Sequence, residues 1–135
     1  MSIYISKKPR FTGVVPSNNI QHRNDATTGT TSVTPTKVKE IITLVTGVWR
    51  VEFKLYTTST TATATGRIYR NGNPYGTTRE TSSTSPVTFQ EDLFFHAGDF
   101  IQLYLNTSDP SYPAVCRDFR LLGDFADQPA YNTLE

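Results

Sequence analysis

The sequence contains little that would cross-link the chain or bind a metal. Its 135 residues include one cysteine, Cys116, and two histidines, His22 and His96. One cysteine cannot form a disulfide within the chain, and a cysteine-rich zinc site is excluded for the same reason. The chain also has no large excess of positive or negative charge, because 13 Lys and Arg nearly balance 12 Asp and Glu, for a formal net charge of +1. This balance does not suggest a protein that binds nucleic acid through its overall charge.

Long apolar segments are lacking as well. No run approaches the roughly 18 residues of a membrane span, and residues 1–8 contain no long apolar core of a secretory signal. We therefore expect a protein that is made in the cytoplasm, is not secreted and has no membrane partner. What is abundant is hydroxyl-bearing side chains, with 22 Thr and 10 Ser. Because β-branched Thr favours strands, the composition predicts a soluble, β-rich protein.

Residues 1–36 differ from the rest of the chain. They contain three prolines, a polar run over residues 24–32 and little apolar periodicity. Such a segment has few side chains whose burial could offset the entropy of ordering it. We predict an extended N-terminal arm, which is either a disordered tail or a segment that orders on a partner, with a short edge strand near residues 3–6. The spaced apolar side chains that would bind the partner are Ile3, Ile5, Phe11, Val14, Val15 and Ile20.

From residue 37 onward the sequence has the pattern of β-strands. In residues 48–56, large apolar side chains alternate with charged ones, as in a strand with one face in a core and the other in water. Asn71-Gly72 is a strong hairpin signal, and we find no tandem repeat. About eight short strands separated by turn signals predict a single jelly-roll β-sandwich over residues 37–125. A polar C-terminal tail is expected over residues 126–135.

Three motifs follow one another in this region. They are residues 47–53 (GVWRVEF), residues 68–72 (IYRNG) and residues 89–103 (FQEDLFFHAGDFIQL). In order and spacing they resemble the G-x-[WY]-x-V-x-F strand, the I-x-x-N-G hairpin and the segment with a Gly-Asp turn of C1q-type and tumour-necrosis-factor-type jelly rolls. The resemblance covers about residues 45–125 and implies a compact trimer with one sheet facing the threefold axis. It also implies binding rather than catalysis.

Viruses use small trimeric jelly rolls of this kind as fibre tips and as capsid decoration proteins. Our first hypothesis is therefore a non-enzymatic phage virion protein, a trimeric capsid decoration (cement) protein that stabilises the head shell. Its partners would be two further copies of itself and the major capsid protein or another virion protein. Three arms that bind at once would give slow release without any single strong site.

The alternative is a receptor-binding or tail-fibre tip module that recognises a host glycan or protein. Residues 71–76 and 106–113 would then make the contacts, with Tyr75 and Tyr112 as exposed anchors. For each tyrosine, packing back onto the sandwich is the competing interpretation. The basic residues 7–10 (KKPR) are expected to be solvated, so we predict no specific nucleic-acid partner.

No group of residues forms a recognisable catalytic or cofactor site. His96 lies close to Asp92 and Asp99 in the sequence, but a metal needs a fuller ligand set, so we interpret residues 96–99 as a turn. The adjacent carboxylates Glu91 and Asp92 point to opposite faces of a strand and cannot flank one glycosidic bond. We expect no catalysis, metal or cofactor, and we place Trp49 and Cys116 in the core.

Overall fold

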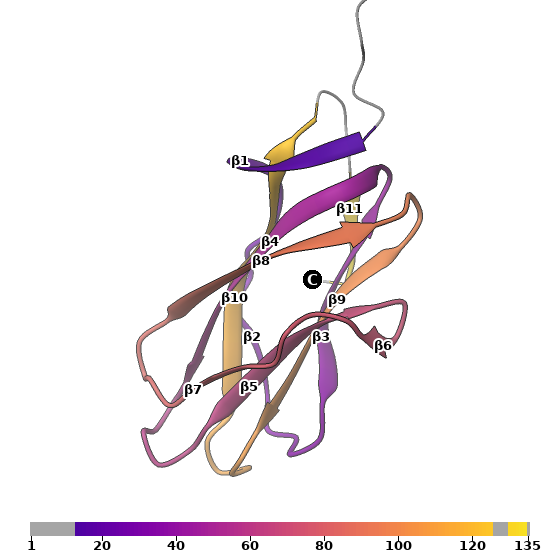
Figure 1. The fold of residues 1–135 in the computed structure, drawn as a ribbon. Coiled ribbons are helices and arrows are strands. Elements are labelled where there is room, and N and C mark those ends of the chain that lie inside the picture. Colours follow the sequence, from indigo (N-terminus) through magenta and orange to yellow (C-terminus); the bar gives the residue numbers. More distant parts are fainter. Residues whose placement is uncertain (1–12, 126–129, 135) are drawn as a thin grey trace, which may run out of the picture.

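The computed structural model describes residues 13–125 and 130–134, and within these ranges it contains eleven strands and no helix (Figure 1). The strands form two sheets, and the predicted all-β jelly-roll sandwich is confirmed. The strand number exceeds the expected eight because three strands are only two or three residues long and others lie outside the predicted boundaries. In chain order they are β1 Gly13–Asn24, β2 Thr28–Thr30, β3 Thr36–Thr43, β4 Thr46–Thr57, β5 Ala64–Arg70, β6 Asn73–Pro74, β7 Arg79–Thr81, β8 Val87–Phe95, β9 Phe100–Thr107, β10 Ala114–Asp124 and β11 Ala130–Leu134.

Sheet A has the order β2-β10-β1-β4-β8, and sheet B has the order β11-β3-β9-β5-β6, with β7 also beside β5. Strand β10 is central to sheet A. It pairs with β4 along one edge, and with β1 and β2 along different stretches of the other edge. In the ranges that the structure describes, no helix is long and apolar enough to cross a membrane.

A single core of apolar side chains lies between the sheets. In β4, the side chains of Trp49, Val51, Phe53 and Leu55 are buried, as their alternation with charged residues predicts. The indole Nε1 of Trp49 donates a hydrogen bond to Thr43 Oγ1 at 3.0 Å. This bond satisfies the one polar atom of a fully buried ring, so the predicted core position of Trp49 is confirmed.

The predicted core position of Cys116 is also confirmed. Its side chain is fully buried between the sheets. Burial raises the pKa of the Cys116 thiol to about 12, because the apolar surroundings disfavour the thiolate. A thiol that stays protonated is a poor nucleophile, so Cys116 acts as a small apolar side chain.

Two predicted turns are present. Asn71 and Gly72 have φ angles of 51° and 85°, as a tight hairpin turn between β5 and β6 requires. In the turn between β8 and β9, Gly98 has a φ of 93°, and the amide of His96 donates a hydrogen bond to Asp99 Oδ2 at 2.8 Å. The interpretation of residues 96–99 as a turn is therefore confirmed.

The N-terminal boundary differs from the prediction. Strands β1 and β2 pair antiparallel with β10, so the extended arm expected over residues 1–36 is wrong for residues 13–30. Residues 1–12 lie outside the described residues. Val14, expected to bind a partner, is 3% exposed and belongs to the core. These polar strands gain backbone hydrogen bonds from β10, a distant segment that local periodicity does not reveal.

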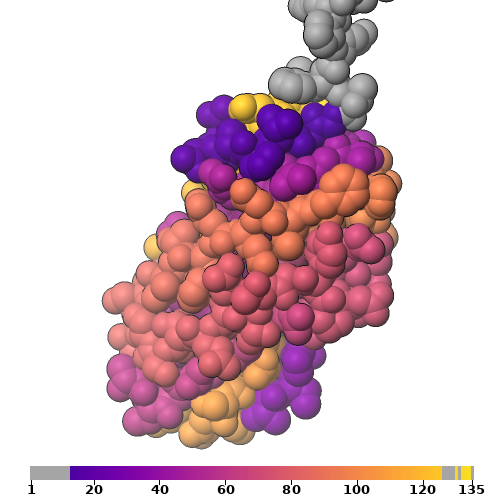
Figure 2. All heavy atoms as spheres, in the orientation of Figure 1, coloured from indigo at the N-terminus to yellow at the C-terminus, as the bar shows by residue number. Residues whose placement is uncertain are grey.

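The expected C-terminal tail also contains a strand. Strand β11 pairs antiparallel with β3, which corrects the prediction for residues 130–134. Asn24 Nδ2 donates a hydrogen bond to the Leu134 carbonyl at 2.8 Å, and His22 Nε2 lies 2.6 Å from Asn132 Oδ1. Strand β11 therefore links sheet B to β1 of sheet A. Figure 2 shows the indigo residues of β1 and yellow C-terminal residues together at one end of the molecule.

The sandwich contains two interleaved halves, although the sequence shows no tandem repeat. Strands β2, β3, β4 and β5 correspond in order to β7, β8, β9 and β10. The ladders match as well: β2–β10 corresponds to β7–β5, β3–β9 to β8–β4, and β4–β10 to β9–β5. Within the described chain, β2–β5 do not pair with one another, and neither do β7–β10. Each sheet therefore takes strands from both halves.

Equivalent positions in the two halves are about 50 residues apart. Two hydrogen-bonded Gln–Glu pairs at equivalent positions show this spacing most clearly. In sheet A, Gln90 Nε2 donates a hydrogen bond to Glu52 Oε1 at 2.8 Å, and in sheet B, Gln102 Nε2 donates one to Glu40 Oε2 at 2.7 Å. The same Gln–Glu pair thus occurs on both outer faces, with the two residue types exchanged between the strands.

Candidate functional site

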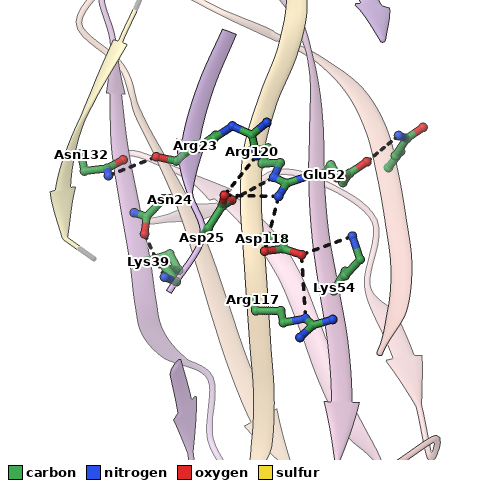
Figure 3. Close-up of polar contacts among 11 residues, drawn as sticks. Arg23, Asn24, Asp25, Lys39, Glu52, Lys54, Arg117, Asp118, Arg120 and Asn132 are labelled. Atoms are coloured by element: carbon green, nitrogen blue, oxygen red, sulfur yellow. Dashed lines mark hydrogen bonds and ion pairs between the residues drawn. The ribbon is translucent and has the colours of Figure 1, made fainter. Parts of the chain in front are cut away.

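The outer face of sheet A carries a network of charged side chains, which we name the charged face. At its centre, the Arg120 guanidinium binds the Asp25 carboxylate through two bonds, Nε to Oδ1 at 2.8 Å and Nη2 to Oδ2 at 3.2 Å (Figure 3). The same guanidinium lies 3.5 Å from Asp118 and 3.9 Å from Glu52. Arg120 therefore faces three carboxylates, which come from β4, from β10 and from the segment that follows β1.

A bulge in β10 brings Asp118 into this network. The pairing of β10 with β4 shifts by one position between Arg117 and Arg120, and Asp118 has a φ of 54°. A residue in this left-handed conformation re-aims its side chain relative to a regular strand. As a result, Asp118 lies 3.4 Å from Lys54 and 3.8 Å from Arg117 (Figure 3).

The charges on this face compensate one another. Hydrogen bonds from Arg120 lower the pKa of Asp25, together with a hydrogen bond from Arg23 and the charges of both arginines, and these effects outweigh the opposing effect of burial. At the edge of the sheet, Arg50 binds Asp92 at 2.9 Å and Asn18 at 2.7 Å. Because most of these charges already have partners within the chain, the charged face offers little to a charged ligand.

The outer face of sheet B differs, and we name it the tyrosine face. The rings of Tyr69 in β5 and Tyr104 in β9 are stacked, with centroids 3.8 Å apart and planes 13° from parallel. Both side chains point away from the core, because Ile68 beside Tyr69, and Leu103 and Leu105 beside Tyr104, are buried on the opposite face. Beside them, Glu40 accepts bonds from Gln102 at 2.7 Å and from Lys37 at 2.9 Å.

The tyrosines occupy the positions that Arg120 and Lys54 occupy in sheet A. Tyr69 pairs with Gln102 as Arg120 pairs with Glu52, because each ladder has the same place in its half. The two equivalent faces have therefore acquired different chemistry. One is a charged network, and the other presents a half-exposed aromatic pair.

The described part of the chain brings few of the predicted partner-binding residues together. Ile3, Ile5 and Phe11 lie outside the described residues. Val15 and Ile20, on β1, are 40% and 37% exposed and remain available for contact. Val14 is buried in the core and is not available for contact.

The two loop tyrosines are both half-buried. The Tyr75 hydroxyl donates a hydrogen bond to the Phe94 carbonyl at 2.7 Å, and its ring packs at 60° against Phe95. Tyr75 therefore packs back on the sandwich along one side. Tyr112 lies in the β9–β10 loop, where its backbone carbonyl accepts a bond from Thr107 Oγ1 at 2.7 Å.

Sequence reasoning missed Tyr69 and Tyr104. A signal existed, because both are large aromatic residues at positions that strand alternation assigns to the wet face. Their stacking could not be anticipated, since it depends on the pairing of β5 with β9.

The residues considered for catalysis are held apart. The Glu91 carboxylate accepts bonds from the Thr77 amide at 2.9 Å and the Thr77 hydroxyl at 2.8 Å, whereas Asp92 binds Arg50 on the charged face. The prediction that these adjacent carboxylates do not face each other is confirmed. The His96 ring meets Phe94 edge-on, with centroids 4.8 Å apart. Within residues 13–125 and 130–134, no three His, Cys, Asp or Glu side chains are placed to share a metal ion.

No protein-family model matches the chain, and no curated protein matches it with significant similarity.

Proposed function

We propose that the protein is a non-enzymatic phage virion protein, a homotrimeric capsid decoration (cement) protein whose tyrosine face forms the contact between copies. The observation that carries this proposal is the stacked pair Tyr69–Tyr104 on the outer face of sheet B. Tyrosine is enriched at protein interfaces because it buries a large rigid ring while its hydroxyl can still bind water or a partner. A cement protein needs such a self-contact to place several shell-binding segments on one particle.

The contrast between the two faces supports the choice of sheet B. Most charges of the charged face are paired within the chain, so its burial against another copy would cost desolvation without new partners. On the tyrosine face, Arg67 donates to the Gly76 carbonyl at 2.6 Å and Lys37 binds Glu40. The aromatic pair, by contrast, has no side-chain hydrogen bond or ion pair to another described residue. An aromatic centre with a polar rim is the usual anatomy of a protein interface.

Attachment to the shell would involve residues 1–12 together with the exposed side chains of β1. Gly13 and Val14 pair in parallel with β4, so the segment that precedes them starts from a fixed point of sheet A. We expect Ile3, Ile5 and Phe11 to contact the capsid, with Val15 and Ile20 adding to the same contact. Three such segments on one trimer would bind cooperatively through a high effective concentration.

Sedimentation of the purified protein, alone and mixed with expanded capsids that lack it, tests both the contact between copies and the attachment to the shell. We expect a trimer that co-sediments with capsids. Deletion of residues 1–12 should abolish co-sedimentation and leave the trimer intact. The double substitution Tyr69→Ala and Tyr104→Ala should give monomers.

The control is Lys54→Ala, which changes the equivalent position of Tyr104 on the charged face and should remain trimeric. A wild-type monomer would refute the role of the tyrosine face. A trimer that does not bind capsids would refute the cement function and favour the receptor-binding alternative.

A further inference from the structure

A small pocket lies at the β5–β6 hairpin, and we name it the hairpin pocket. Its volume is about 160 Å³, and it is lined by Arg70, Asn71, Asn73, Pro74 and Tyr75. Pockets for drug-sized ligands are larger, about 300–1,000 Å³. The hairpin pocket is therefore suited to one small group, such as a single sugar residue.

Arg70 differs from the other arginines of the described chain. Five of them, Arg23, Arg50, Arg79, Arg117 and Arg120, lie within ion-pair distance of a carboxylate. A sixth, Arg67, donates to a backbone carbonyl. Among the residues that the structure describes, Arg70 has no such acceptor, and its guanidinium lies over the Tyr75 ring, 4.7 Å from the centroid. Its planar set of N–H donors is thus available for a ligand.

The pocket is held in place without a ligand. Tyr75, which supports Arg70, is fixed by its hydrogen bond to the Phe94 carbonyl and by its contact with Phe95. The side chain of Asn71 accepts a bond from the Phe100 amide at 2.8 Å and donates one to Asp99 at 3.0 Å. A site that is already ordered loses less entropy when a ligand binds.

The local charge selects the type of anion. Burial raises the pKa of Asp99, but hydrogen bonds from Asn71 and the His96 amide and the nearby charges of Arg70 and His96 outweigh it, so the pKa lies below its usual value. Asp99 is thus ionised at neutral pH and offsets only part of the charge of Arg70, with which it forms no ion pair among the described residues. A doubly charged phosphate would be repelled there, whereas a singly charged carboxylate matches the planar guanidinium and can bind it through two bonds.

Asn73 indicates what else the ligand carries. Its side chain is exposed and has no hydrogen-bond partner among the described residues, so its amide can both donate and accept. Such an amide suits adjacent sugar hydroxyls, because it can accept a hydrogen bond from one hydroxyl and donate one to the next. We propose that the hairpin pocket binds the carboxylate-bearing residue of an acidic glycan, with Arg70 pairing with the carboxylate and Asn73 bonding a neighbouring hydroxyl. This inference does not depend on the cement function, since it uses neither the tyrosine face nor residues 1–12.

Titration of the full chain followed by ¹H–¹⁵N NMR tests the proposal, with methyl glucuronide and methyl glycosides of N-acetylneuraminic acid as probes. We expect saturable shifts of the amide signals of residues 70–73, 75 and 76 with at least one of these acidic sugars. Arg70→Gln should weaken binding about tenfold or more, as expected for the loss of a charge-assisted bond. Arg70→Lys should weaken it too, because lysine keeps the charge but loses the paired donors.

Arg117→Gln is the matched control, since it removes one arginine from the charged face and should bind normally. Each variant is first checked for wild-type thermal stability, because Arg70 packs on Tyr75. Equal binding of neutral methyl glucoside would overturn the role of the carboxylate. Equal binding of acetate or of a glutamate-containing tripeptide would overturn the role of the sugar hydroxyls, and the absence of shifts with all acidic sugars would overturn the proposal.

Discussion

Arg120 shows how a single residue connects distant parts of the sandwich. Its guanidinium binds Asp25, which follows β1, and lies beside Asp118 of β10 and Glu52 of β4. Arg120 is partly shielded, with a side chain that is 19% exposed. Partly shielded networks with two-bond arginine contacts are more stabilising than isolated surface pairs.

The pH dependence of stability should report on the Asp25–Arg120 contact. The pKa of Asp25 is lowered in the folded state, mainly by bonds from Arg120. Its contribution is therefore complete above the pKa of the unfolded chain, about 4, and is lost as the pH falls through the lower folded-state pKa. Asp25→Asn should reduce the free energy of unfolding by about 1 kcal/mol at neutral pH, with the difference from wild type shrinking in acid.

Urea unfolding at several pH values measures this difference. The control is Glu80→Gln, since Glu80 is exposed and has no ion pair among the described residues. A difference between Asp25→Asn and wild type that stays constant down to acidic pH would contradict the assignment.

Strand β1 shows how an element is held by residues outside itself. Two glycines, Gly47 at the start of β4 and Gly123 near the end of β10, lie against Val14 and Val15 of β1. A Cβ at Gly47 would meet the Val14 carbonyl, and one at Gly123 would lie 2.6 Å from Val14 Cγ2 and 2.8 Å from the Val15 carbonyl. Gly47 also has a φ of 147°, which side-chain-bearing residues rarely adopt. These glycines allow the close approach that buries Val14.

Gly123→Ala should therefore loosen β1. The added methyl group cannot fit without moving Val14 or the backbone, and overpacking of this kind costs about 1–3 kcal/mol. We expect a lower melting temperature and faster amide hydrogen exchange in residues 13–24 than in the rest of sheet A. Unchanged stability and exchange would show that β1 is not packed as described.

The β8 edge of sheet A is protected by side chains. Tyr75 donates to the Phe94 carbonyl at 2.7 Å, and Arg79 donates to the Gln90 carbonyl at 3.3 Å. These bonds occupy acceptors that would otherwise be open to another strand. The segment between β6 and β7 therefore covers an edge that would be prone to aggregation.

For the whole molecule, the decisive feature is the interleaving of its two halves. Strands β2–β5 pair with strands β7–β10 and not with one another, within the described chain. A half on its own could form no ladder of either sheet beyond the short pairings of β1 with β4 and of β5 with β6. Such long-range pairing also slows folding, because loops must close before contacts form.

Fragments 1–76 and 77–135 should therefore be unfolded when separate. Neither contains partners for its long strands, so we expect disordered circular dichroism and narrow NMR dispersion from each. Mixing them should restore the β-sheet spectrum if association outcompetes aggregation. A folded fragment on its own would contradict the interleaved topology.

The sequence by itself determined the all-β class, the core face of β4, the Asn71-Gly72 hairpin and the turn at residues 96–99. Each depends on side-chain alternation or on backbone preferences of a few neighbouring residues. Because these signals involve only neighbouring residues, they can be predicted from the sequence without a structure.

Only the tertiary structure decided that β1, β2 and β11 belong to the sheets, that Tyr69 stacks on Tyr104, and that Arg70 lacks a carboxylate partner among the described residues. These polar strands carry no clear hydrophobic period, and they are held by backbone bonds to strands far away in the chain. The partners of a surface side chain likewise depend on which distant strand lies beside it. In this fold the neighbouring strand nearly always comes from the other half of the chain.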